Sequence, residues 1–251
     1  MTHLLRQVIR EEIEKILTEG IHDPGILKAV FFTGGPGSGK SYVSRILFGI
    51  QPLKTMHSSS TVSGLKIVNS DSIFEKMLHD ANVDMARLGK IEKENPEQWA
   101  DIMKLRDKAK DLTTQRLKMY LLGRLGILID TTGAQSEKIR KQKQLMENLG
   151  YDTYLIFVNT SLEVALERNR FRGTQGERTL SDDMVKEIWH EAQENLGELQ
   201  NIVGSDKVLV IDNTKSGPID TQYEKAVQKI LRAPIENHIG QEWMKKQKNK
   251  Q

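Results

Sequence analysis

The sequence predicts an α/β fold: a doubly wound, five-stranded parallel sheet with helices on both faces. Two observations predict it. Short runs of β-branched and aromatic residues alternate with helical patterns from about residue 28 to residue 214, and a glycine-rich turn joins the first strand to the first helix. In such folds the functional residues gather at the carboxyl ends of the strands. A chain of 251 residues is long enough for one domain of this kind with appendages.

The five expected strands cover 29–33, 65–71, 124–133, 152–159 and 206–214. The third is almost wholly apolar around Ile127 to Ile129, as a parallel strand covered on both faces requires. Asn95 followed by Pro96 is typical of a helix start, and apolar spacing continues from there to 123 without a breaker. The other helices are expected at 40–48, from Ser72 onward, and at 135–149, 161–171 and 181–203.

The two ends of the chain lie outside this alternation. Residues 1–20 form an amphipathic pattern, expected to be a helix that packs on the domain's own sheet or docks on a partner protein or a second copy. The domain itself is expected at 26–233, and 234–251 is expected to be a basic tail whose last seven residues, KKQKNKQ, are disordered. A serine-rich stretch at 51–64 has no periodicity and predicts a surface loop.

Composition excludes several classes of protein. Cysteine is absent, so the chain has no disulfide framework, thiolate metal site or cysteine nucleophile, and a reducing cytoplasm is the simple expectation. The formal net charge of +3 neither requires nor excludes a nucleic-acid partner. No apolar run approaches the length of a membrane span, and the six histidines show no metal-ligand spacing. We therefore expect a soluble cytoplasmic protein.

The stretch GGPGSGKS at 34–41 carries the strongest functional signal. It fits the phosphate-loop pattern GxxxxGK followed by Ser or Thr, and it lies between an expected strand and an expected helix, as that pattern requires. Glycine allows main-chain N–H groups to face an anion, and the helix after the loop points unpaired N–H groups at the same place. The expected ligands are ATP and Mg²⁺, with Lys40 on the β- and γ-phosphates and Ser41 on the metal. The nucleotide-binding set is Gly34, Gly35, Gly37, Ser38, Gly39, Lys40 and Ser41.

Two carboxylates follow neighbouring predicted strands. Asp71 ends the second strand and Asp130 the third, so a parallel sheet should deliver both to the cleft that holds Lys40 and Ser41. We assign Asp71 as the base that orients an attacking hydroxyl and Asp130 to the metal side. The alternative for Asp71 is a structural role as a helix N-cap.

Four arginines lie in LERNRFRGTQGERTL: Arg168, Arg170, Arg172 and Arg178. Arg168 and Arg172 are four residues apart, so on a helix they share a face and reach a common anion. The glycine-bearing loop expected at 172–180 predicts a mobile arginine lid that closes over the γ-phosphoryl group. Surface ion pairs, for instance with Glu163 or Glu167, are the alternative.

The combination of GGPGSGKS, VNSD, LIDTTG and ALERNRFRGTQGERTL resembles the P-loop kinases that include phage polynucleotide 5′-kinases and zeta toxins. The resemblance covers about residues 28–214 and implies a P-loop NTPase fold similar to nucleoside-monophosphate kinases. It implies that Lys40 and Ser41 bind ATP and Mg²⁺, that Asp71 is the base, and that Arg168 and Arg172 are lid arginines. The sequence departs from the phage kinases in lacking an arginine soon after Asp71, where IFEKML offers only Lys76.

These motifs leave several functions open. The acceptor of a kinase could be a hydroxyl of a nucleic acid or nucleotide, which the lid resemblance favours, or a nucleotide sugar as for zeta toxins, which would often act with an antitoxin partner. DTTG at 130–133 also fits the DxxG pattern of GTPases, but no Asn-Lys-x-Asp segment comes after a later strand. A partner-remodelling ATPase and a non-catalytic ATP-binding module are the remaining alternatives.

Overall fold

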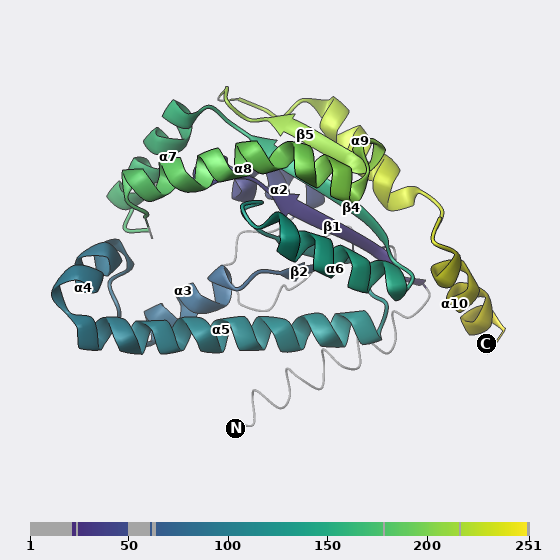
Figure 1. Cartoon of the computed structure of the whole chain (residues 1–251), viewed down its shortest axis with the longest axis horizontal. Coiled ribbons are helices and arrows are strands. Elements are labelled where there is room, and N and C mark those ends of the chain that lie inside the picture. The colour runs from purple at the N-terminus through teal and green to yellow at the C-terminus, as the bar shows by residue number, and fades with distance from the viewer. Residues whose placement is uncertain are drawn as a thin grey trace.

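The computed structural model describes residues 22–23, 25–49, 61, 64–177, 179–215 and 217–249 (Figure 1). The predicted N-terminal helix at 1–20 and most of the serine-rich loop lie outside the described residues. Five strands form one sheet: β1 (Lys28–Thr33), β2 (Lys66–Val68), β3 (Ile127–Asp130), β4 (Asp152–Asn159) and β5 (Val208–Asp212). Every pairing is parallel and the strand order is β2-β3-β1-β4-β5. The predicted five-stranded parallel sheet is confirmed.

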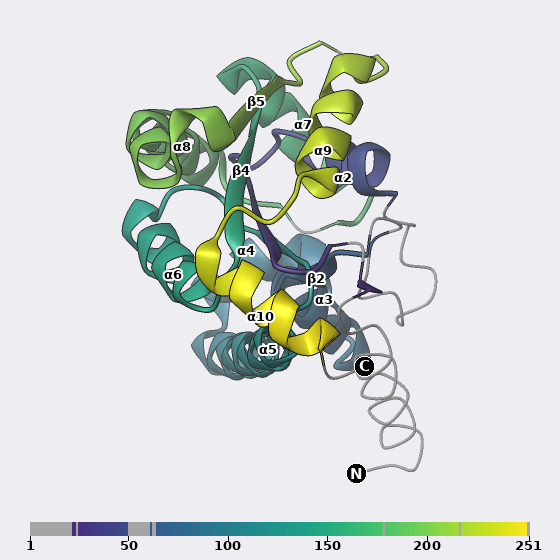
Figure 2. The ribbon, with the colours of Figure 1, turned by 90° about the vertical axis from the view of Figure 1, so that its right-hand side faces the viewer.

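Helices cover both faces of the sheet, as Figure 2 shows. On one face, α2 (Lys40–Phe48) and α9 (Thr221–Arg232) bury Val43, Leu47 and Val227 against the strands. On the other face, α6 (Ser136–Asn148) and α8 (Asp182–Val203) pack with the carboxyl-terminal end of α5 (Pro96–Leu122). Buried β1 side chains alternate between the two cores, with Phe31 in one and Phe32 in the other, as the pleat of a strand dictates.

A third hydrophobic cluster lies away from the sheet, among α3 (Asp71–Asp80), the short helix η2 (Met85–Arg87), α4 (Leu88–Glu94) and the first half of α5. Phe74, Leu78 and Ile102 are its buried centre. Asn95 caps α5 as predicted, because its side chain accepts a hydrogen bond from the main-chain N–H of Gln98. These helices form a small unit of their own below the strand ends in Figure 1.

The predicted lid segment differs from the structure. The helix expected to end at 171 is α7 (Leu162–Thr174), so the first three residues of the predicted lid loop are helical. Hydrogen bonds join the end of the remaining loop to helix α7. The buried Asn169 side chain donates to the carbonyl oxygen of Leu180 at 2.8 Å and accepts from its N–H at 3.2 Å. The lid segment is therefore shorter than predicted, and its far end is tied back to α7.

The prediction that KKQKNKQ is disordered is wrong for 245–248, which form the last turn of α10 (His238–Lys248). Helix α10 has an apolar face as well as its charged residues, because Trp243 and Met244 pack against the main core. The helix start is anchored by the buried carboxylate of Asp152, which accepts hydrogen bonds from the main-chain N–H groups of Glu236 and Asn237. Lys28 pairs with the same carboxylate at 3.0 Å, so the carboxylate that anchors the start of α10 belongs to a buried ion pair.

Across the described residues, none of the helices is both long enough and apolar enough to cross a membrane.

Candidate active site

The glycine-rich loop between β1 and α2 is packed so tightly that side chains are excluded at three positions. Gly34, Gly37 and Gly39 have φ angles of +148°, +73° and +83°, a region that favours glycine. A Cβ at Gly37 would lie 2.2 Å from the carbonyl oxygen of Ala165 in α7, and one at Gly39 would lie 2.3 Å from the Asn213 amide nitrogen. The loop is therefore held between α7 and the end of β5.

Lys40 and Ser41 open helix α2 directly after this loop, with Gly39 at the cap position. The Lys40 ammonium donates a hydrogen bond to the carbonyl oxygen of Gly34 at 2.6 Å. Burial lowers the pKa of Lys40, nearby Asp130 and Asp71 raise it, and Arg172 lowers it further. The Lys40 ammonium thus lies beside the glycine loop and lines the cavity, where it would donate to an anion bound by the loop.

Two buried polar atoms beside the loop have no hydrogen-bond partner. They are the Ser38 hydroxyl oxygen and one terminal guanidinium nitrogen of Arg168. The Arg168 nitrogen lies close to Gly39, since a Cβ there would be 3.4 Å from it. Buried polar groups are nearly always paired, so unpaired donors around a bare main chain fit an anionic ligand. The residues present therefore fit a nucleoside triphosphate.

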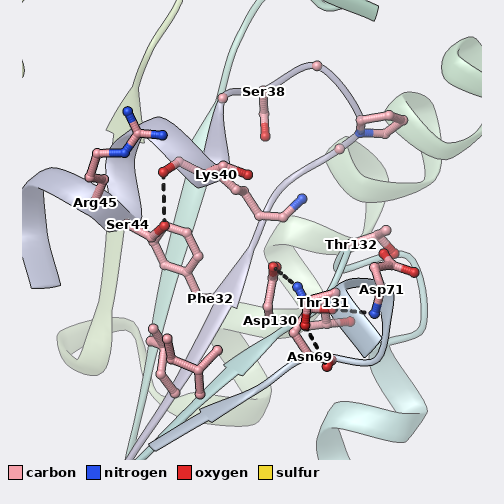
Figure 3. Close-up of a pocket in the computed structure, with 18 of the residues that line it drawn as sticks. Phe32, Ser38, Lys40, Ser44, Arg45, Asn69, Asp71, Asp130, Thr131 and Thr132 are labelled. Atoms are coloured by element: carbon pink, nitrogen blue, oxygen red, sulfur yellow. Dashed lines mark hydrogen bonds between the residues drawn. The ribbon is translucent and has the colours of Figure 1, made fainter. Parts of the chain in front are cut away.

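The two predicted carboxylates lie on one side of the same cavity, which has a volume of about 390 Å³ and is lined by Lys40, Ser41, Asp71, Asp130 and Arg172 among others. Asp130 ends β3, and burial raises its pKa, with Lys40 opposing and Asp71 adding to the shift. Figure 3 shows Asn69 between the two acids. Its amide donates to Asp130 at 2.8 Å and accepts from the main-chain N–H of Asp71 at 2.7 Å.

The prediction that Asp71 ends the second strand is wrong, because β2 ends at Val68 and Asp71 is the first residue of α3. Asp71 also does not occupy the cap position, which belongs to Ser70. Its carboxylate is about half exposed and faces a cation from a distant helix: a guanidinium nitrogen of Arg106 in α5 lies 3.7 Å from Oδ1. The Arg106 guanidinium also lies over the ring of Phe74, 5.3 Å from its centroid. An arginine thus stands beside Asp71, but it comes from α5 and not from the segment just after Asp71.

The arginines of the predicted lid have different environments. Arg172 lines the cavity and also lies 4.0 Å from Glu177, while Arg168 reaches the phosphate loop. Arg170 points elsewhere, because it forms an exposed ion pair with Asp182 at the start of α8. Arg178 lies outside the described residues. The ion-pair alternative therefore applies to Arg170, whereas Arg168 lies beside Gly39 of the loop and Arg172 lines the cavity.

Sequence reasoning missed three polar residues of the site. Asn69 stands in the VNSD segment, and its position just after a strand was the available signal. Asn213 comes after β5 in the same way, and its amide donates to the carbonyl oxygen of Ser38 at 2.8 Å. Nothing in the sequence around Arg106 distinguishes it from the other charged residues of α5.

Comparison with known proteins agrees with this architecture. Residues 30–199, more than half of the chain, match the family model AAA_33, described as an AAA domain. The chain belongs to this family. The predicted resemblance to P-loop kinases is confirmed at the level of the domain and its fold. No curated protein is similar enough to the chain to count as a relative.

Three solved structures share the fold at low sequence identity. A proposed kinase from Chloroflexus aurantiacus has a TM-score of 0.50 and 15% identity, over 81% of this chain and 96% of that one. A chain of the PezAT chromosomal toxin–antitoxin system of Streptococcus pneumoniae has a TM-score of 0.50 and 15% identity, over 100% and 96%. A chain of the complex of AvrRxo1-ORF1 with AvrRxo1-ORF2, solved with ATP, has a TM-score of 0.53 and 12% identity, over 90% of this chain and 72% of that one.

A magnesium ion would find few protein ligands here. Within the residues described, no three histidine, aspartate or glutamate side chains gather into a metal-binding group. Mg²⁺ in phosphoryl-transfer sites is usually held by one or two protein groups together with waters and the phosphates themselves. Ser41 and Asp130, which line the same cavity as Lys40, fit that arrangement.

Proposed function

We propose that the protein is a kinase that moves the γ-phosphoryl group of ATP to a hydroxyl of a nucleic acid or nucleotide. The observation that carries the proposal is the convergence of Lys40, Asp71, Asp130 and Arg172 on one cavity beside a bare glycine loop. A site built only to hold a nucleotide has no use for a half-exposed carboxylate across from the phosphate loop. A site for phosphoryl transfer needs one to receive a proton.

In the proposed reaction the acceptor oxygen forms a bond to the γ-phosphorus while the bond from that phosphorus to the β-phosphate oxygen breaks. Asp71 accepts the hydroxyl proton, and ADP leaves with the electron pair of the broken bond. Gly34, Gly35, Gly37, Ser38, Gly39 and Lys40 hold the phosphates, and Arg168 and Arg172 neutralise the charge that develops on the transferred group. Mg²⁺, held through Ser41 and Asp130, would supply further neutralisation of the phosphate oxygens.

The acceptor is tested with γ-labelled ATP and a panel of alcohols: 5′-hydroxyl DNA and RNA, hydroxymethylated DNA, nucleosides, nucleoside monophosphates and UDP-sugars. We expect label to appear in a nucleic acid or nucleotide. Label found only in a UDP-sugar would move the proposal to a nucleotide-sugar kinase, the class to which zeta toxins belong. ATP or GTP hydrolysis at a rate that no acceptor changes would overturn the kinase proposal.

Variants separate the roles of the side chains. Lys40→Ala and Arg172→Ala should each lower the transfer rate by about 10²–10⁵-fold, because each removes a cation from the developing charge. Asp71→Asn should lower transfer by roughly 10²–10⁴-fold while ATP affinity stays within a few-fold of wild type. Arg170→Ala is the matched control for Arg172, since Arg170 belongs to the same helix but pairs with Asp182. Equal losses in the two arginine variants would remove Arg172 from the site.

A further inference from the structure

Asn69 lies at the carboxyl end of the sheet, directly after strand β2. Strands β2 and β3 pair in parallel with Val68 opposite Ile129, so Asn69, the first residue after β2, lies beside Asp130, the last residue of β3. Two residues later the chain enters α3 at Asp71. Asn69 is therefore the side chain that stands between the last residue of β3 and the first residue of the helix after β2.

The nitrogen and the oxygen of the Asn69 side-chain amide each form a hydrogen bond. Its nitrogen donates to Oδ2 of Asp130 at 2.8 Å, and its oxygen accepts from the N–H of Asp71 at 2.7 Å (Figure 3). These neighbours fix the orientation of the amide, because a carboxylate only accepts and a main-chain N–H only donates. A flipped amide would place two acceptors together and two donors together, so a single rotamer satisfies both contacts.

We propose that Asn69 is a positioning residue that sets the distance and orientation between Asp130 and Asp71. The inference rests on the proposed function, in which these two acids serve the metal side and the acceptor hydroxyl. Asp130 is fixed by the sheet, whereas Asp71 belongs to the helical unit around Phe74 and Leu78, which has its own core. The Asn69 amide is a hydrogen-bonded link between these two bodies. Groups that orient the ligands of a metal typically change affinity or activity by about 10–100-fold when removed.

Two substitutions separate the two contacts of the amide. Asn69→Asp keeps an oxygen that accepts from the Asp71 N–H, but it loses the donor to Asp130 and places two carboxylates in contact. Asn69→Ala loses both contacts. The matched control is Asn195→Ala in α8, because the Asn195 amide also holds the loop after β3, donating to the carbonyl oxygen of Ala134 at 2.7 Å, without a hydrogen bond to either acid.

The first readout needs no nucleotide or metal. Amide hydrogen exchange at Asp71 should become faster in Asn69→Ala, because the N–H loses its acceptor, and should stay near the wild-type rate in Asn69→Asp and Asn195→Ala. Unchanged exchange in Asn69→Ala would overturn the proposed link. Circular dichroism and the thermal midpoint of each variant distinguish this local change from a general loss of folding.

The second readout is turnover with the acceptor found in the labelling panel. Both Asn69 variants should lower kcat by about 10–100-fold with KM for ATP within a few-fold of wild type, while Asn195→Ala stays near wild type. A wild-type kcat in Asn69→Asp would show that the contact with Asp130 has no part in positioning, and would overturn the proposal.

A third readout keeps this inference distinct from the proposed function. Calorimetry measures how much Mg²⁺ tightens ATP binding, and in Asn69→Ala that tightening should shrink by roughly 10-fold whether or not any acceptor is known. If wild type transfers phosphate to no acceptor but the exchange and Mg²⁺ effects appear, the proposed kinase function fails and the role of Asn69 stands. If transfer occurs but Asn69→Ala leaves exchange, Mg²⁺ tightening and kcat unchanged, the role of Asn69 fails alone.

Discussion

The contact between the phosphate loop and α7 makes Gly37 a sharp test of the structure. Replacing Gly37 by alanine adds a Cβ that would lie 2.2 Å from the carbonyl oxygen of Ala165 and 2.7 Å from its Cα. Both neighbours are main-chain atoms of a helix, so the strain is not relieved by rotating a side chain. Either the loop or α7 must move.

Gly176 provides a control with the same backbone. Its φ is also +73°, but a Cβ there would meet nothing within 4 Å. Alanine at this φ costs both variants about 1–2 kcal/mol. The clash with Ala165 adds the cost of overpacking, about 1–3 kcal/mol, to Gly37→Ala alone. The expected difference between the two variants is therefore about 1–3 kcal/mol.

Urea unfolding and ATP binding together measure this cost. With a slope of about 2–3 kcal/mol per molar urea, the Gly37→Ala midpoint should lie roughly 0.3–1.5 M below that of Gly176→Ala. If the loop shifts locally instead of weakening the fold, the same free energy appears as an ATP affinity reduced by about 5–150-fold. The reasoning is refuted if Gly37→Ala matches Gly176→Ala in urea midpoint and also in ATP affinity.

Two further predictions concern buried charges. Burial lowers the pKa of Lys40, whereas a hydrogen bond to Asp101 raises the pKa of the exposed Lys104. Competitive amine labelling followed by mass spectrometry should therefore give Lys40 a lower titration midpoint than Lys104. Reversed midpoints would contradict the electrostatics described. Asp152→Ala leaves the buried Lys28 ammonium without its carboxylate partner and should lower the free energy of unfolding by about 3–5 kcal/mol in urea. Glu94→Ala, which breaks an exposed pair with Lys90, should cost less than about 1 kcal/mol, and similar costs in both variants would contradict the burial of the first pair.

Much of the fold could be predicted from local pattern. Each strand is a short run rich in apolar residues, and some helices carry their own start signal, as Asn95 does for α5. Parallel pairing then brings the strand ends to one edge, which is why Asp71, Asp130 and Lys40 meet as predicted. The wrong prediction at α10 also concerns local pattern. The charges of the last seven residues indicated disorder, whereas Trp243 and Met244 form an apolar face that packs on the core.

The candidate site also has a part that could be predicted from the sequence and a part that could not. The sequence by itself determined the glycine loop, its lysine and serine, and the placing of Asp71 and Asp130 near the carboxyl ends of β2 and β3, because these depend on spacing along the chain and on the direction of parallel strands. The tertiary structure alone decided that Arg106 faces Asp71, that Arg170 turns to Asp182, and that residues 238–248 form a packed helix. Those outcomes depend on how each helix is rotated against its neighbours, and that rotation is set by contacts between residues far apart in the chain.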